Sequence, residues 1–421
     1  MTIRIINGKR LRTDFTWQDS QSIDILDGRI ASLDAEAHDA GKVIDAQGCL
    51  ILPGLIDLNV SLREPGYTSK GSVLSETKAA VAGGVTQLCC SPQTSPVNDS
   101  RAVTKLIKEL ASSAGYCDVF PLGALTRGLK GEQLSEYAAL KSAQCIALSN
   151  AYNPIKNLAI TKRCFDYAQT HGMSVFVNPI EASLHKGAMH EGHVSTTIGL
   201  QGIPAVAETI AVSQLIQLAC ASGVHLHLSQ LSAKGSVEQL RIAKQSGAKV
   251  TADVAIQNLL YTDDMTEAFS SIYHCLPPLR EDSDRQALIA GIIDGTIDAI
   301  TSAHQPHEAE AKQMPFAETD PGMSTIEFLL PMAQILSQRN ELDLALFIKA
   351  MTQGAASVLN FPSMPLEEGS VASLVIYDAN KECQVTNEMI ISKGKNTPLL
   401  GKYIVGQVKA TISKGRLVFE G

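Results

Sequence analysis

The chain has 421 residues, of which 45% are hydrophobic, enough for one large α/β unit and a smaller one. Its 35 Lys and Arg against 43 Asp and Glu give a net charge of −8 without long blocks, which argues against nucleic acid or an anionic membrane surface as a partner. No apolar run approaches the ~20 residues of a membrane span, the N-terminus lacks a signal-peptide pattern, and the nine cysteines lack metal-type spacing. We therefore expect a cytoplasmic protein with reduced thiols.

The N-terminal 52 residues indicate short strands separated by turns. We expect strands at 3–6, 22–26, 30–33 and 42–44, with Asp27-Gly28 as a hairpin turn.

Residues 53–357 alternate short apolar runs with helical patterns. The predicted strands are 55–61, 85–91, 119–125, 145–149, 174–178, 224–229, 250–254 and 299–303. The predicted helices are 74–82, 101–112, 132–142, 160–170, 205–221, 237–245 and 285–293. Eight strands alternating with helices indicate an α/β fold with a (β/α)₈ TIM barrel.

The C-terminal residues return to a strand pattern, with strands expected at 369–377, 383–386, 403–412 and 417–419 and a turn at Lys414-Gly415. Two β-rich ends around a barrel predict one small composite β-sandwich domain. The predicted domains are 1–52 plus 358–421 for the β domain and 53–357 for the barrel.

The first barrel strand ends in Asn59-Val60-Ser61, between Pro53-Gly54-Leu-Ile-Asp and Leu62-Arg63-Glu64-Pro65-Gly66. This frame resembles the start of a dihydroorotase barrel in the amidohydrolase superfamily, where the tripeptide is His-x-His. Alternate strand residues share a face, so two histidines there point at one zinc ion. Asn59 and Ser61 are not normal zinc ligands.

The resemblance extends to the ends of later strands, where the family has further metal ligands and an aspartate that moves a proton. An acidic pair of the family corresponds to Asn150 and Ala151, two histidines correspond to Pro179 and Gln230, and the catalytic aspartate corresponds to Ala303. The resemblance therefore implies no catalytic residue, no metal and no cofactor. On this basis we predict that the chain is not an enzyme.

Part of the family's substrate pocket is retained in the sequence. Positions that contact substrate in the family correspond here to Arg63, Gln93, Leu276, His307, Pro321 and Gly322. A guanidinium suits a carboxylate ligand, which makes a vestigial carboxylate pocket one interpretation. The alternative is that Arg63 pairs with Glu64, Glu181 or another internal acid.

Other polar residues have structural interpretations that we favour over functional ones. His225-Leu226-His227 and His304-x-x-His307 could form a relocated metal site, but hydrogen-bonded core histidines explain them better. We expect His185, His190 and His193, in the loop after the fifth strand, to lie at the surface or to take part in loop packing. For Ser72 and Glu76, helix capping is a sufficient explanation.

Within this family, the chain resembles the inactive dihydroorotase-like members. That resemblance implies a structural and assembly role in pyrimidine biosynthesis, as a partner of aspartate transcarbamoylase catalytic chains in a hetero-dodecamer of six plus six. Self-association is also expected. Two alternatives stay open: an amidohydrolase of the dihydroorotase or hydantoinase kind with an atypical metal site, and a small-molecule-sensing barrel that uses Arg63 and His307.

Overall fold

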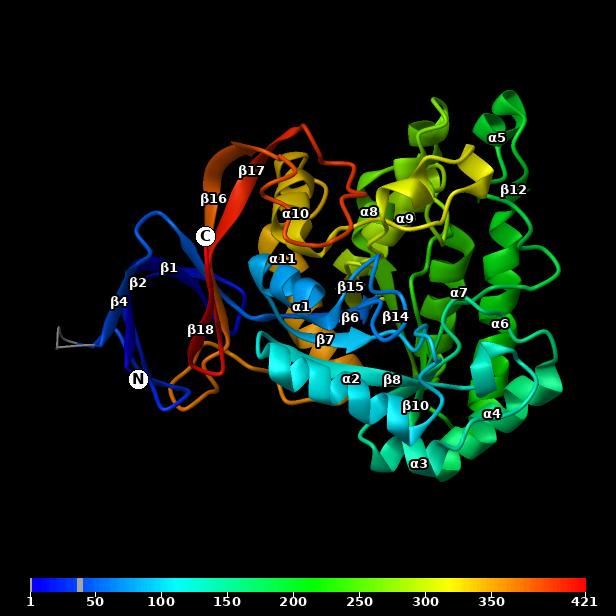
Figure 1. The fold of residues 1–421 in the computed structure, drawn as a ribbon, viewed down its shortest axis with the longest axis horizontal. Helices are drawn as coiled ribbons and strands as arrows, with labels where there is room; N and C mark the ends of the chain where they lie inside the picture. The colour runs from blue at the N-terminus through cyan, green and yellow to red at the C-terminus, as the bar shows by residue number, and fades with distance from the viewer. Residues whose placement is uncertain (1, 36–40) are drawn as a thin grey trace.

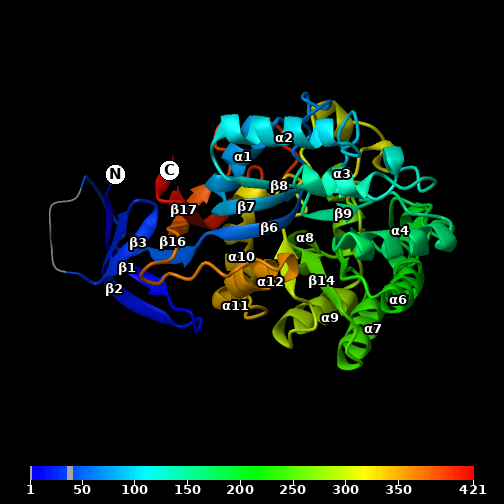
Figure 2. The same cartoon turned by 90° about the horizontal axis from the view of Figure 1, so that it is seen from below.

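The computed structural model describes residues 2–35 and 41–421. Figure 1 shows a barrel surrounded by helices, with a separate sheet at one end of the molecule that contains both termini. Figure 2 shows the same division from below, with the sheet to the left of the barrel. The predicted fold class is therefore confirmed.

Eight parallel strands form the barrel, each paired with its neighbour along the chain. They are β6 (Leu55–Val60), β7 (Val85–Cys90), β8 (Asp118–Ala124), β9 (Ala147–Ser149), β10 (Ser174–Val177), β13 (Leu226–Leu228), β14 (Val250–Ala255) and β15 (Ala299–Thr301). A parallel bridge between Val60 and His304 connects the two ends of this order and nearly closes the barrel. Each strand lies within a range predicted from the sequence or within one residue of it.

The outer helices follow the strands. They are α1 (Val73–Ala82), α2 (Arg101–Ala114), α3 (Tyr137–Ser142), α4 (Leu158–Thr170), α6 (Ala205–Ser222), α7 (Lys234–Gln245), α9 (Asp282–Ile293), α10 (Leu329–Gln338), α11 (Leu344–Lys349) and α12 (Ala355–Leu359). The prediction for 132–142 began too early, because Gln133 O accepts from Arg127 N and Ser135 N donates to Leu125 O, which holds this stretch as a loop. The helices after residue 328 were not predicted.

The terminal sheet is built from both ends of the chain. It comprises β1 (Ile3–Leu11), β2 (Trp17–Leu26), β3 (Arg29–Leu33), β4 (Lys42–Asp45), β5 (Leu50–Pro53), β16 (Leu374–Gln384), β17 (Tyr403–Ser413) and β18 (Arg416–Glu420). The order β18-β17-β16-β5-β1-β2-β3, with β4 beside β1, places C-terminal strands directly against N-terminal ones.

Both predicted hairpin turns are confirmed. Asp27 and Gly28 have φ of 48° and 81°, and Lys414 and Gly415 have φ of 49° and 75°. Two consecutive residues with positive φ are typical of tight hairpins, because that backbone twist matches the twist of the strands.

Helix α6 departs from the expectation that no segment approaches the length and hydropathy of a membrane span. Its 18 residues have a mean hydropathy of 1.3, and one third of them are buried. The helix packs beside α4 and α7 on the outside of the barrel. Its length and composition are therefore explained by packing on a barrel strand, and part of its apolar surface stays exposed.

Candidate functional site at the barrel mouth

Four non-glycine residues at the carboxyl ends of barrel strands have left-handed backbone. The φ angles are 64° at Arg63, 47° at Ala151, 58° at Gln230 and 48° at Ala303. This conformation costs about 1–3 kcal/mol for such residues and clusters at functional sites. In a (β/α)₈ barrel the chemistry sits at this same end, so the mouth is the candidate site.

A hydrogen-bond network of amides and one phenol fills the centre of the mouth. Gln230 Oε1 accepts from Tyr152 Oη at 2.5 Å and from Asn178 Nδ2 at 2.9 Å. Gln305 Nε2 in turn donates to Tyr152 Oη at 2.8 Å. Burial raises the pKa of Tyr152, so this phenol is neutral at physiological pH.

Asn150 is held by its own loop. Its Oδ1 accepts from Thr126 Oγ1, and its Nδ2 donates to Asn153 O, both at 2.7 Å. The neighbouring Ala151 is buried and offers no donor or acceptor on its side chain. Asn150 therefore serves as a loop support, with both ends of its amide engaged.

Pro179 and Gln230 line a small cavity of about 30 Å³. Among the described residues, Gln230 Nε2 is buried without a hydrogen-bond partner. The volume of this cavity suits one water molecule, which would satisfy that donor.

The first and last barrel strands meet beside Asp57. Its Oδ1 accepts from Asn59 N at 3.1 Å and from Ser302 N at 3.3 Å. Ser61 N donates to His304 O at 2.9 Å, and both Ser61 and Ala303 are buried. Complete burial raises the pKa of Asp57. The carboxyl group of Asp57 therefore links the first barrel strand to the segment after the last one, and so helps to close the barrel.

These side chains do not fit a zinc ion. Zinc in proteins takes thiolate, imidazole or carboxylate ligands, whereas the positions above offer amides, a hydroxyl, a proline ring and methyl groups. Within residues 2–35 and 41–421, no group of three or more His, Cys, Asp or Glu side chains could hold a metal ion.

The paired histidines of β13 belong to the barrel interior. His227 is fully buried and contacts Asp253 Oδ2 and Thr251 Oγ1, each at 2.9 Å. His225 contacts Thr251 Oγ1 at 3.1 Å and Ser174 Oγ at 3.0 Å. Each nitrogen of the two rings therefore contacts a hydroxyl group or the carboxylate of Asp253. This agrees with the prediction that both are hydrogen-bonded histidines of the barrel core.

The interpretation of Glu76 as a capping residue is wrong, whereas Ser72 does cap α1 by accepting from Ser75 N. Glu76 Oε2 lies 2.8 Å from His304 Nε2, and it also accepts from Ser392 Oγ at 2.6 Å. Glu76 Oε1 accepts from Lys393 N at 3.2 Å. Burial is the largest influence and acts to raise the pKa of Glu76, but the hydrogen bonds from His304, Ser392 and Ser75, together with the charge of His304, outweigh it and hold the pKa below its usual value.

His190 is buried in the segment after β10, which agrees with the loop packing expected for this group of histidines. Its Nδ1 lies 3.1 Å from Arg280 Nη1. Arg280 also donates to Ser232 Oγ at 2.7 Å and lies 3.6 Å from Glu208. His190 thus packs beneath the loop after β10 and supports a buried ion pair.

A second cavity, of about 260 Å³, lies at the outer part of the mouth. Its lining residues are Arg63, Tyr67, Lys70, Gln93, Tyr152, Leu276, Gln305, His307, Asp320 and Pro321. Five of the six residues assigned to a carboxylate pocket from the sequence lie here. The sixth, Gly322, lies beside the cavity and donates its N–H to His274 O at 2.8 Å.

Arg63 does not pair with the acids that were considered as partners. Glu64 accepts from Val73 N at 2.9 Å, and Glu181 accepts from Ser183 N at 3.1 Å. Arg63 instead donates to Pro306 O at 3.1 Å, and its Nη2 lies 3.0 Å from His307 Nε2.

Two further residues complete this cluster: Asp320, in the loop that the resemblance assigned to the substrate pocket, and Lys70, which was not singled out from the sequence. Lys70 Nζ lies 2.5 Å from Asp320 Oδ2 and 3.2 Å from His307 Nδ1. Burial and the cations of Arg63 and Lys70 lower the pKa of His307 to about 3. The result is a cavity that contains the cations of Arg63 and Lys70, a neutral imidazole and the half-exposed carboxylate of Asp320, with Glu308 3.7 Å from Lys70. Of these groups, Arg63 has no carboxylate partner within the described residues, which leaves its guanidinium for a small anion.

Comparison with known proteins places this geometry in a family. The family model described as Dihydro-orotase-like matches residues 48–236. A dihydroorotase-like protein of Pseudomonas putida is 41% identical, with 99% of both chains covered. A dihydroorotase of Trichlorobacter lovleyi is 39% identical, with 90% of both chains covered. An L-hydantoinase structure from Arthrobacter aurescens superimposes with a TM-score of 0.88 at 21% identity, covering 99% of this chain and 96% of that one, and supports the fold.

These relatives correct the prediction that the chain is not an enzyme. Proteins named dihydroorotase match it over most of its length at 37–39% identity, and hydantoinases share its fold. Replaced side chains at a few positions are a weaker guide to class than similarity along the whole chain. The chain belongs to the dihydroorotase-like family.

Proposed function

We propose that this dihydroorotase-like protein is an assembly subunit of aspartate transcarbamoylase in pyrimidine biosynthesis, located in the cytoplasm. The observation that carries the proposal is the network of Tyr152, Gln230 and Gln305 at the barrel mouth. Gln230, which corresponds to one of the family's metal ligands, is held there by Tyr152 and Asn178, inside an intact ring of eight parallel strands.

An assembly role explains why the chain keeps the family's fold although the residues at the family's metal-ligand positions are different. A protein–protein interface requires a fixed shape of about 800 Å² on each partner, and it does not require zinc. The left-handed backbone at Gln230 and Ala303 is a feature of the scaffold that persists without the family's ligands.

Co-expression with aspartate transcarbamoylase catalytic chains tests this proposal. We expect one complex on size-exclusion chromatography with light scattering, containing both chains in equal numbers. Two separate peaks at micromolar concentration would contradict the proposal. The control is a dihydroorotase chain that is co-expressed with the same aspartate transcarbamoylase catalytic chains. It shows how much of the association is non-specific.

A second candidate is hydrolysis of a cyclic amide that carries a carboxylate, such as dihydroorotate. Two observations favour it: the named dihydroorotase relatives, and the cavity in which Arg63, Lys70 and His307 lie together. The guanidinium and ammonium would hold the carboxylate of such a ligand.

Ring opening of dihydroorotate, followed with and without added Zn²⁺, tests the second candidate. Turnover that Arg63→Gln abolishes and exposed Arg29→Gln leaves unchanged would support it. Absence of turnover at all metal concentrations, together with no calorimetric binding of dihydroorotate, would refute it. This result is independent of the co-expression experiment.

A further inference from the structure

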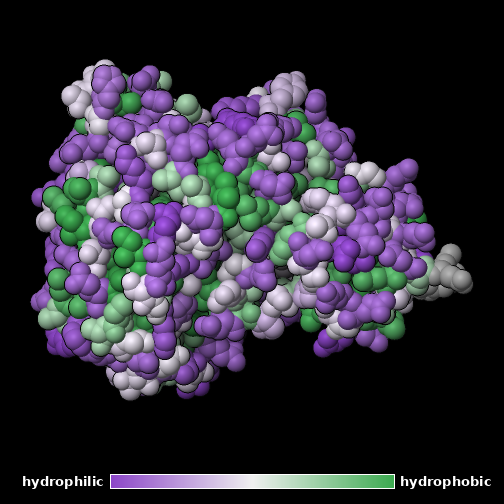
Figure 3. Space-filling model, turned by 180° about the vertical axis from the view of Figure 1, so that it is seen from behind, coloured by the Kyte–Doolittle hydropathy of each residue, from purple (hydrophilic) through white to green (hydrophobic). Residues whose placement is uncertain are grey.

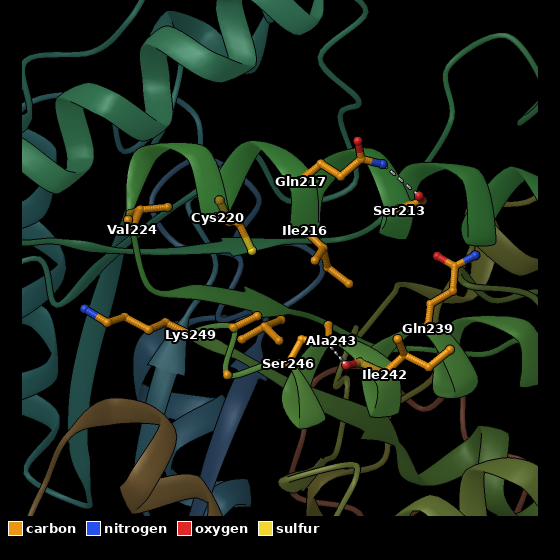
Figure 4. A pocket seen from close by; sticks show the side chains of 15 residues that line it. Ser213, Ile216, Gln217, Cys220, Val224, Gln239, Ile242, Ala243, Ser246 and Lys249 are labelled. Carbon is orange, nitrogen blue, oxygen red and sulfur yellow. Dashed lines mark hydrogen bonds between the residues drawn. The ribbon is translucent and has the colours of Figure 1, made fainter.

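Cavities lie both on the outside of the barrel and at its mouth. The outside groove runs between α6 and α7 and has a volume of about 540 Å³ (Figure 4). Gln217, which lines it, donates to Ser213 of the same helix at 3.2 Å, so these two polar side chains are already paired. Figure 3 shows the apolar residues of the barrel half as separate patches among polar ones. At the mouth, by contrast, polar side chains from several loops converge on two cavities that share a wall.

Tyr152 and Leu276 form the wall between the two mouth cavities. Both side chains line the outer cavity of about 260 Å³ and also the inner cavity of about 30 Å³. Arg63 lines the outer cavity, whereas Pro179 and Gln230, which correspond to metal ligands of the family, line the inner one. A ligand held by Arg63 is therefore separated from these positions by the phenol ring.

The loop after β9 directs Tyr152 into the mouth. Ala151, the residue before it, has a φ of 47°, a conformation that residues other than glycine adopt rarely. Ala151 N donates to Ser149 Oγ at 2.9 Å, and Asn153 N donates to Asn150 O at 3.1 Å. The hydrogen bonds of the loop itself thus hold the turn that places the phenol.

The phenol oxygen lies between two amides that are themselves fixed. It donates to Gln230 Oε1 at 2.5 Å and accepts from Gln305 Nε2 at 2.8 Å. Asn178 Nδ2 also donates to Gln230 Oε1, and Gln305 N donates to Met323 O at 2.7 Å. A ligand that displaced the phenol would have to break both of its bonds, which weakens binding by roughly tenfold or more.

The inner cavity behind Tyr152 suits a neutral part of a ligand. Its apolar lining includes Ile180, Ile203 and Pro278. Its charged residues Glu208 and Arg280 lie 3.6 Å apart and neutralise one another. Gln230 Nε2, a buried donor without a partner among the described residues, is available to a carbonyl oxygen. Apolar walls with a few placed polar groups are typical of small-molecule sites.

We propose that Tyr152 is a specificity-determining residue that blocks the way from the carboxylate-binding cavity to Gln230. A ligand anchored at Arg63 is then held by its carboxylate alone. Removal of the phenol would join the cavities into one site for a cyclic amide that carries a carboxylate, with the carboxylate at Arg63 and a ring carbonyl at Gln230. The proposal rests on the carboxylate pocket of the second candidate function and is independent of the assembly role.

Calorimetry with dihydroorotate and with propionate tests the block, because both ligands have one carboxylate and only the first has a ring amide. In the parent we expect their dissociation constants to differ by less than threefold. In Tyr152→Ala we expect dihydroorotate to bind at least tenfold more tightly than in the parent, and propionate to change by less than threefold.

Two control variants separate the block from other effects. Tyr152→Phe keeps the ring and removes the hydroxyl, so its dissociation constant for dihydroorotate should stay within threefold of that of the parent. Arg63→Gln should weaken both ligands at least tenfold, in the parent and in Tyr152→Ala, because it removes the anchor. Circular dichroism establishes that each variant is folded.

A measurement on the parent covers the case in which Tyr152→Ala does not fold. In protein labelled with 3-fluorotyrosine, the ¹⁹F resonance of Tyr152, assigned by its loss in Tyr152→Phe, should respond equally to the two ligands. A larger change with dihydroorotate would show that the ring displaces the phenol, and would overturn the block.

The calorimetric outcomes distinguish the block from the pocket on which it rests. Binding of both ligands with no gain for dihydroorotate in Tyr152→Ala would overturn the block and leave the carboxylate pocket intact. An equal gain for propionate would also overturn it, because propionate has no group for Gln230. Absence of binding by either ligand to any variant would refute the carboxylate pocket and the block together.

Discussion

His304 Nε2 lies 2.8 Å from Glu76 Oε2, and neither side chain has exposed surface. Thr325 N donates to His304 Nδ1 at 3.1 Å, so the ring proton is on Nε2 and is donated to the carboxylate. The same carboxylate accepts from Ser392 Oγ and Lys393 N. One buried acid therefore connects α1, the end of the last barrel strand and the segment between β16 and β17.

Replacement of Glu76 should destabilise the whole chain. Glu76→Ala leaves His304 and Ser392 without an acceptor, and we expect a loss of about 3–5 kcal/mol in the free energy of unfolding. Glu76→Gln keeps one acceptor and should cost about 2 kcal/mol. Urea unfolding measures both, with exposed Glu238→Ala as the control. Equal stability of Glu76→Ala and the parent would refute this role.

Tyr152→Phe tests the network at the barrel mouth. The substitution removes the donor to Gln230 and the acceptor for Gln305, both in a buried setting. We expect a loss of about 1–3 kcal/mol in the free energy of unfolding, because the partners remain buried. Tyr67→Phe at the exposed edge of the same cavity should change stability by less than about 0.5 kcal/mol. Similar values for the two variants would show that the network adds nothing.

Acid should destabilise the protein through His307 and His274. Their pKa values are lowered to about 3 and about 4, His307 by burial and by Arg63 and Lys70, and His274 by burial and Lys312. Between about pH 6.5 and 4 the unfolded chain binds these protons and the native state does not, so stability is lost as pH falls. Each histidine contributes up to about 1.4 kcal/mol per pH unit in that window.

Asp263 acts in the opposite direction, because burial raises its pKa to about 6 and the native state then keeps a proton that the unfolded chain releases. Two histidines against one aspartate leave a net loss of stability on acidification. Urea unfolding at pH 7, 6 and 5 measures the slope, and His307→Gln should bring it close to zero between pH 6 and 5, because the one remaining histidine then balances Asp263. An unchanged slope in that variant would contradict the assignment.

Reinstated ligands should restore metal binding, because the backbone at Gln230 is still left-handed and Asn59 and Ser61 are alternate residues at the end of β6. A variant with histidine at these three positions and at Pro179 should retain about one zinc ion per chain after desalting. Elemental analysis measures the content. The variant with histidine at 59 and 61 alone should hold zinc more weakly, since two imidazoles leave the coordination half complete. Zinc content equal to that of the parent would show that these positions do not converge.

The barrel was predictable because each of its strands can be recognised from a short stretch of sequence. Strands buried on both faces are short apolar runs, and the eight barrel strands all fall in such runs. The hairpins at Asp27-Gly28 and Lys414-Gly415 were equally readable, since positive φ restricts the residue types that form the turn. The helices from α10 to α12 were missed.

The roles of single polar residues were less predictable. Glu76 lies at the start of a helix, where capping is the ordinary role, yet its partners Ser392 and Lys393 are more than 300 residues away. Lys70 and Asp320 likewise meet at His307 from separate loops. The resemblance placed the Asp320 loop and His307 in one pocket, but nothing in the sequence around Lys70 indicated that it joins them.

The sequence by itself determined the barrel and the β-rich ends, because periodicity is a property of the chain, and its resemblance to the family indicated which side chains stand at the family's metal positions. Only the tertiary structure decided which groups those side chains contact: Gln230 with Tyr152, Arg63 with His307, and Glu76 with His304. It also decided which apolar surface stays uncovered beside α6. Hydrogen bonds and burial depend on distances across the fold, and these arise only when eight strands close into a barrel.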